Sequence, residues 1–86
     1  MEVSFTPQFR RLFKKLPLSL QEEALDKIEQ FKDLDKHSYL KVHKLKGRLA
    51  NRFSYSVNYR YRILFQWEKQ NVSAILIAIG DHAIYD

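Results

Sequence analysis

Two side chains of this sequence are candidates for chemistry on a phosphate: Arg62, in a strand-like segment, and His82, just after the last apolar run. A guanidinium on a rigid strand can bind a phosphate through two hydrogen bonds and stabilise the charge of a pentacoordinate transition state. An imidazole can give or take a proton near neutral pH. Spacing alone leaves two plainer interpretations open, an arginine in a surface salt bridge and a solvent-exposed histidine.

Two further residues could assist such a site. His43 lies in a basic segment and could transfer a second proton, contact phosphate or have no role. Tyr85 could stack on a base or bind phosphate through its hydroxyl, or it could be an aromatic residue anchored in the core. The three histidines have neither the i, i+4 nor the clustered spacing of metal ligands. We therefore expect no metal and no other cofactor.

The excess positive charge of the chain is confined to residues 41–62. This segment holds seven Lys or Arg and no Asp or Glu, whereas residues 1–40 are balanced, and the whole chain carries a net charge of +5. Aromatic residues are interleaved with the cations, so the segment suits a phosphate backbone and stacked bases. A solvated basic loop that serves solubility has the same pattern. The candidate nucleic-acid-binding residues are Lys41, Lys44, Lys46, Arg48, Arg52 and Arg60.

The composition is that of one globular domain, residues 1–86, because 45% of the residues are hydrophobic and Gly and Pro are few. The lack of cysteine excludes disulfides, a thiolate nucleophile and a cysteine-based zinc site. The N-terminus has no export signal, and the longest apolar run, residues 74–79, is far shorter than the roughly 18 residues of a membrane span. We expect a cytoplasmic protein without membrane association.

A short strand at residues 3–5 is predicted to lead into a first helix. Thr6 followed by Pro7 is typical of a helix start, with a capping side chain and then proline at the first helical position. Apolar residues at the spacing i, i+3, i+4, i+7 follow, and Pro17 ends the helix.

A second helix is predicted from a capping-box pattern, Ser19 with Glu22 three residues later. Its amphipathic pattern continues to about Asp35. The two helices are therefore predicted to form a hairpin.

Three strands follow. Residues 53–57 alternate apolar with polar side chains, the period of a strand with one buried face, and residues 59–67 continue this alternation. Residues 72–79 are apolar on both faces apart from Ser73, as in a central strand. The sequence predicts an α+β fold of order β-α-α-β-β-β, with an N-terminal strand and a helical hairpin packed on a small antiparallel sheet whose last three strands form a meander.

This order of elements gives the basic segment a position. Residues 41–48 form the loop that enters the sheet, and Arg60 and Arg62, two positions apart, are predicted to project from one face of a strand. If the helices cover the other face, a half-open basic surface results. The tail at residues 80–85 can fold back over that surface and make it concave.

Three short motifs in this order resemble the RelE/ParE superfamily of toxin-antitoxin toxins. They are Lys44–Arg48 (KLKGR), Arg60–Phe65 (RYRILF) and Ile79–Tyr85 (IGDHAIY), and the resemblance covers nearly the whole chain. It implies a RelE-like fold and a small endoribonuclease that enters the ribosomal A site and cleaves bound mRNA. It also implies a cognate antitoxin, the ribosome and mRNA as partners, and catalysis without a metal.

The resemblance also implies roles for single residues. Arg62 matches the arginine that contacts the scissile phosphate in RelE-like members. His82 lies where RelE has a catalytic arginine and the YafQ-like branch a catalytic histidine. His43 matches a functional histidine of that branch, and Tyr85 matches the terminal aromatic residue of both. The six cations named above are then expected to bind mRNA or rRNA.

The sequence departs from RelE at one strand. Where RelE presents two catalytic lysines, residues 53–57 read FSYSV, so Lys44, Lys46 or His43 would have to act as the general base. Two alternatives follow from the same fold. One is a ParE-like toxin that inhibits DNA gyrase without being a nuclease, and the other is a catalytically degenerate toxin that acts as a binding module.

Overall fold

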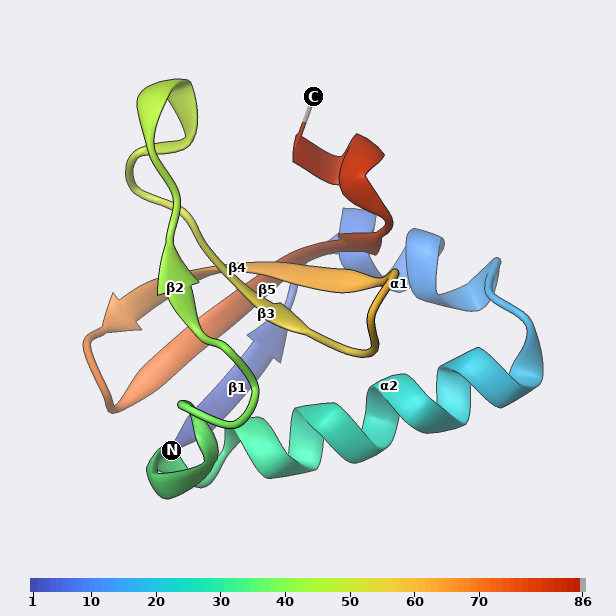
Figure 1. The fold of residues 1–86 in the computed structure, drawn as a ribbon, viewed down its shortest axis with the longest axis horizontal. Coiled ribbons are helices and arrows are strands. Elements are labelled where there is room, and N and C mark those ends of the chain that lie inside the picture. The colour runs from blue at the N-terminus through green and yellow to red at the C-terminus, as the bar shows by residue number, and fades with distance from the viewer. Residues whose placement is uncertain (86) are drawn as a thin grey trace.

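The computed structural model describes residues 1–85 as two α-helices and a five-stranded sheet. The elements in chain order are β1 (Glu2–Phe5), α1 (Pro7–Lys14), α2 (Leu18–Phe31), β2 (His43–Lys44), β3 (Phe53–Ser56), β4 (Arg62–Lys69) and β5 (Ser73–Gly80). Three short 3-10 turns are η1 (Leu34–Lys36), η2 (Gly47–Leu49) and η3 (His82–Tyr85). Helix α2 lies along one side of the sheet and η3 lies on the other side (Figure 1).

The strand order is β1-β5-β4-β3-β2. Strands β3, β4 and β5 form the predicted antiparallel meander, and the predicted α+β class and element order are confirmed. The sheet as a whole is mixed, because β1 pairs with β5 in parallel, with Val3 opposite Ala74. The two-residue strand β2, within the segment predicted to be a loop, pairs with β3 and forms the opposite edge.

The first helix begins as predicted. The Thr6 hydroxyl accepts a hydrogen bond from the Phe9 N–H at 3.0 Å, and Pro7 occupies the first helical position. The same hydroxyl donates to the Ile77 carbonyl at 2.9 Å, so the cap also ties α1 to β5. The capping side chain therefore fixes both the helix start and its contact with the sheet.

The capping-box prediction for the second helix is wrong. Helix α2 begins at Leu18 directly after Pro17, and no side chain caps it. Proline fixes the backbone at the helix entry, so Ser19 already lies inside the first turn. Instead, the Gln21 side-chain amide donates to the Leu16 carbonyl at 3.0 Å and closes the helical hairpin. The helix also ends earlier than predicted, at Phe31.

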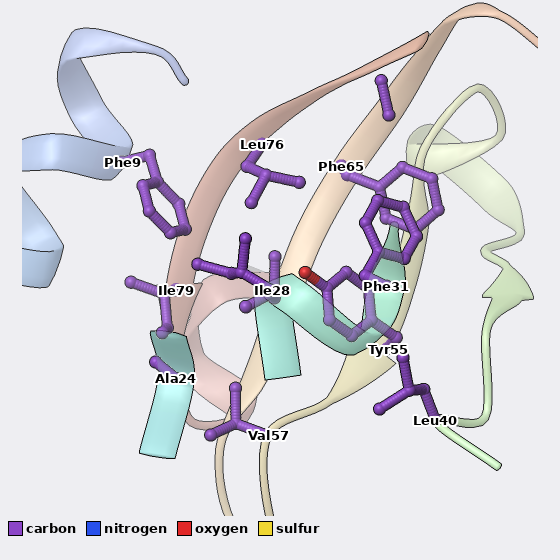
Figure 2. Packing of buried hydrophobic residues seen from close by; sticks show 12 residues of the cluster. Phe9, Ala24, Ile28, Phe31, Leu40, Tyr55, Val57, Phe65, Leu76 and Ile79 are labelled. Atoms are coloured by element: carbon purple, nitrogen blue, oxygen red, sulfur yellow. The ribbon is translucent and has the colours of Figure 1, made fainter. Parts of the chain in front are cut away.

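One face of α2 packs on the sheet and forms the core with it (Figure 2). Phe31 lies at the centre, stacked on Tyr55 of β3 with 4.4 Å between ring centroids and edge-on to Phe65 of β4 at 4.7 Å. All three side chains are fully buried. Aromatic pairs of this geometry stabilise a fold beyond the area they bury. The core therefore occupies the face of the sheet that α2 covers.

The Tyr55 hydroxyl is buried in this core without a hydrogen-bond partner among residues 1–85. A buried hydroxyl without a partner costs about 1–3 kcal/mol of folding free energy. We expect Tyr55→Phe to raise the free energy of unfolding at pH 7 by about 1 kcal/mol, measured by urea denaturation. A decrease would show that the hydroxyl is hydrogen-bonded in solution.

Burial also raises the pKa of Tyr55 well above its ordinary value of 10.0. Tyr55 therefore ionises at a lower pH in the unfolded chain than in the folded protein. Its contribution to the free energy of unfolding is constant below about pH 10 and falls as the pH rises further. Phenylalanine does not ionise, so the gain of Tyr55→Phe in the free energy of unfolding over wild type should increase above pH 10.

Candidate active site

The candidate residues are arranged by the pairing of the strands on the face opposite α2. Side chains alternate along a strand, so Ser54 and Ser56 of β3 project away from the buried Tyr55. Arg62 lies opposite Ser56 on one side and Gly80 on the other. His43 of β2 lies opposite Ser54. Directly opposed residues project from the same face, so Arg62, His43 and the two serines share it.

The C-terminal turn η3 crosses this face. The Tyr85 hydroxyl lies 2.7 Å from the Ser54 hydroxyl, which is fully buried. Leu64 and Ala78 also lie on this face. Both are buried, although the helices α1 and α2 cover the opposite face. The prediction that residues 80–85 fold back over the sheet is confirmed. Tyr85 is thus held by β3, a contact between residues 31 positions apart.

Gly80 is the position at which β5 gives way to this turn. A β-carbon at Gly80 would lie 2.5 Å from Ile84 Cγ2, so Gly80→Ala must displace Ile84. We expect a loss of about 1–3 kcal/mol in the free energy of unfolding and a shifted NMR signal for Tyr85. Gly47→Ala is the matched control, because Gly47 has φ 72 and no atom near a β-carbon. The loss of stability in Gly47→Ala comes from the backbone conformation alone. The NMR signal of Tyr85 should therefore not shift.

The Arg62 guanidinium is half-buried and oriented by backbone carbonyls. Its Nη1 donates to the Asn58 carbonyl at 2.6 Å and to the Tyr61 carbonyl at 3.2 Å. Within residues 1–85, Nη2 and Nε make no hydrogen bond and no carboxylate pairs with the guanidinium. These donors are therefore available to a ligand, and an anionic phosphate matches their charge.

Asn58, which belongs to none of the sequence motifs, holds the turn before Arg62. Its side-chain oxygen accepts from the N–H groups of Arg60 and Tyr61 at 2.9 and 2.7 Å. Its side-chain nitrogen donates to Glu23 of α2 at 2.7 Å. An asparagine that binds the backbone two residues onward is a known turn signal, and it could have identified this position.

This turn corrects the prediction for Arg60. Because Asn58 closes the turn over Arg60, strand β4 begins only at Arg62. Arg60 lies exposed in the turn, with its guanidinium carbon 6.0 Å from the Tyr61 ring centroid. The prediction that the two arginines project from one face of one strand is therefore wrong.

The three histidines have different environments. His82 is exposed in η3, with its ring centroid 6.1 Å from that of Tyr85. His43 is exposed, and its Nδ1 lies 2.8 Å from the Lys41 carbonyl. A carbonyl only accepts, so Nδ1 carries the proton. Nε2 makes no hydrogen bond within residues 1–85 and can act as an acceptor in the neutral ring. His37 is a structural residue, because it lies 2.7 Å from the Phe31 carbonyl and stacks on that ring.

The remaining cations differ in burial and in their contacts. Arg52 is half-buried and donates to Gln66 Oε1 at 2.6 Å. Lys44 lies opposite Phe53, one position from His43, and is exposed. Lys46 and Arg48 are exposed in the loop that carries η2, which rises from the same side of the sheet as η3 (Figure 1).

The positive charge of this region is not compensated locally. The ion pairs in residues 1–85 join Lys27 with Asp26 and Lys32 with Glu29, and none involves a basic residue of the segment 41–62. This part of the chain also contains no group of three or more His, Cys, Asp or Glu that could hold a metal ion. Nor does any of its helices combine the length and apolar composition needed to cross a membrane.

Solved structures share this fold over nearly their whole length. The toxin–antitoxin complex RelBE2 from Mycobacterium tuberculosis contains a chain that is 23% identical, with a TM-score of 0.75 over 94% of this chain and 96% of that one. The YoeB/ParE toxin from Agrobacterium tumefaciens is 18% identical, with a TM-score of 0.76 over 95% and 99%. The intact RelBE complex from E. coli matches at 17% identity, with a TM-score of 0.69 over 93% and 94%.

Sequence comparison identifies the family. A search of curated proteins finds no match. The family model of the HigB-like toxin, described as the RelE-like toxin of the type II toxin–antitoxin system HigB, matches residues 8–79, which include most of α1, all of α2 and most of β5. A match over this much of the chain agrees with the RelE-like fold described above. The chain therefore belongs to the HigB-like family of RelE-like toxins of type II toxin–antitoxin systems.

Proposed function

We propose that this toxin is an endoribonuclease that cleaves mRNA in the ribosomal A site without a metal ion. The main support is the position of Arg62, which pairs with Gly80 two residues before His82 and lies on the sheet face opposite α2. Within residues 1–85 its Nη2 and Nε make no hydrogen bond. One cation for a phosphate and two exposed imidazoles for proton transfer are the groups that such a reaction requires.

The cleavage can be assigned step by step to these residues. Neutral His43 takes the proton of the ribose 2′-hydroxyl through Nε2, and the 2′-oxygen forms a bond to the adjacent phosphorus. The bond from phosphorus to the 5′-oxygen breaks, and protonated His82 gives its proton to that oxygen. Arg62 binds the non-bridging oxygens, whose charge increases in the transition state. The products are a 2′,3′-cyclic phosphate and a 5′-hydroxyl.

Tyr85 has a positioning role in this proposal. Its hydroxyl is held by Ser54, and its ring lies beside His82, so it can orient a base or the leaving nucleotide. The surrounding cations bind the phosphate backbone of mRNA and rRNA. They are Lys41, Lys44, Lys46, Arg48, Arg52 and Arg60. A cytoplasmic location follows from the ribosome as partner. Several structures of the same fold are toxin–antitoxin complexes, and we propose that an antitoxin also binds this chain.

The test compares wild-type protein with Arg62→Ala and His82→Ala. In a translation extract, wild type should cut translated mRNA and leave 2′,3′-cyclic phosphate ends, while both variants leave it intact. Gyrase supercoiling is measured in parallel. Intact mRNA with inhibited gyrase would instead support a ParE-like toxin. Growth arrest without either effect would support a binding module.

A further inference from the structure

A concave surface adjoins the turn that holds Arg62. A pocket of about 260 Å³ is formed between α2, the loop before β2 and the turn between β3 and β4. Its polar lining consists of Lys27, Tyr39, Lys41, Ser56 and Asn58. The volume is below the range of about 300–1,000 Å³ that encloses a whole small molecule. The pocket therefore suits one part of a longer ligand that is held mainly elsewhere.

Two of these residues connect the pocket directly to Arg62. The Asn58 carbonyl accepts a hydrogen bond from the Arg62 guanidinium at 2.6 Å. Ser56 lies opposite Arg62 across the β3–β4 pair. A chain molecule with one phosphate at Arg62 would therefore reach this pocket with a neighbouring unit.

The chemistry of the lining matches a nucleotide. Tyr39 is 71% exposed, although large aromatic residues are usually more buried. The ammonium group of Lys27 lies 5.9 Å from the centre of that ring, and its contact with Asp26 is long, at 3.9 Å. Lys41 forms no ion pair within residues 1–85. An exposed aromatic face beside two lysines is the combination that stacks a base and binds its phosphate.

The backbone of Lys41 gives an independent indication. Lys41 has φ 61, in the left-handed region that a residue with a β-carbon adopts at a cost of about 1–2 kcal/mol. The Lys41 carbonyl oxygen lies 2.8 Å from Nδ1 of His43, which donates to it. Glycine would relieve this strain, yet the position holds a long cationic side chain that lines the pocket. Strain of this kind is concentrated at functional sites.

We propose that this pocket is a second nucleotide subsite, which takes the nucleotide next to the scissile phosphate. The base stacks on Tyr39, and the phosphate of that nucleotide lies between Lys27 and Lys41. The assignment rests on the proposed function, because it requires an RNA strand bound at Arg62. It extends that function by giving the enzyme a contact that holds substrate without taking part in bond cleavage.

Lys41→Gly separates the two roles of this residue. It should raise the midpoint of thermal unfolding, because strain is relieved, and raise KM for ribosome-bound mRNA roughly tenfold with kcat changed less than about threefold. The matched control is Asn71→Gly, since Asn71 has the same φ of 61 in the β4–β5 turn. It should be stabilised or unchanged and keep the wild-type KM. A stabilised Lys41→Gly protein with an unchanged KM would overturn the subsite.

A binding measurement tests the subsite without any cleavage. The full chain with His82→Ala is titrated with a 2′-O-methyl RNA trinucleotide and followed by NMR. Amide signals of Tyr39, Lys41 and Asn58 should shift, and Tyr39→Ala should weaken binding about tenfold or more. If the wild-type protein does not cleave mRNA in the translation extract, such shifts would support the subsite while the nuclease is refuted. Shifts that leave all three residues unaffected would refute the subsite, whether or not mRNA is cleaved.

Discussion

Arg62→Ala should lower the rate of mRNA cleavage on the order of 10²–10³-fold, which corresponds to about 3–4 kcal/mol of transition-state stabilisation. The guanidinium is half-buried at the start of β4, and its Nη2 and Nε make no hydrogen bond within residues 1–85, so they can bind phosphate oxygens. The loss should appear in kcat rather than in KM, because the charge on those oxygens grows as the 2′-oxygen attacks. Single-turnover cleavage of mRNA on saturating ribosomes measures this effect.

Two further variants define what Arg62 contributes. Arg62→Lys retains the charge but loses the planar pair of donors, so it should recover only a small part of the rate. Arg60→Ala removes a cation two positions away that lies exposed in the turn, and it should retain kcat within about threefold. An equal loss in Arg60→Ala and Arg62→Ala would mean that overall charge matters and that no specific phosphate site exists at Arg62.

His82→Ala should lower the cleavage rate on the order of 10²–10⁴-fold, the usual contribution of a general acid or base. The side chain is exposed and makes no hydrogen bond within residues 1–85, so its loss should change the free energy of unfolding by less than about 0.5 kcal/mol. Because the ring is open to solvent, added imidazole should restore part of the rate. The rate is measured on ribosome-bound mRNA with and without imidazole.

His37→Ala is the control with the opposite expectation. It loses the contact of 2.7 Å with the Phe31 carbonyl and the stack on that ring, so stability should fall by about 2 kcal/mol. The cleavage rate per folded molecule should stay at the wild-type value. If His82→Ala retains the wild-type rate while His43→Ala abolishes it, the proton donor is a different group and His82 has no catalytic role.

Features set by neighbouring residues were predictable from the sequence. Thr6 and Pro7 start α1 because capping depends on four consecutive residues. The alternation from Phe53 to Ser56 determines that Ser54 faces away from the core, since side chains alternate strictly along a strand. The uncompensated charge of residues 41–62 is a property of composition, and the motifs around Arg62 and His82 identified the superfamily.

The remaining features depend on which of several competing contacts forms, both between neighbours and between residues distant in the sequence. Ser19 has the pattern of a helix cap, but the Gln21 contact with Leu16 and the preceding proline decide where α2 begins. The 2.7 Å contact of Tyr85 with Ser54, the start of β4 at Arg62 and the left-handed backbone of Lys41 all follow from how turns and strands close on one another. Local patterns determine which face a side chain occupies, because they repeat over a few residues. Only tertiary packing decides which side chains meet, because that depends on strand order and on the total burial that the whole chain achieves.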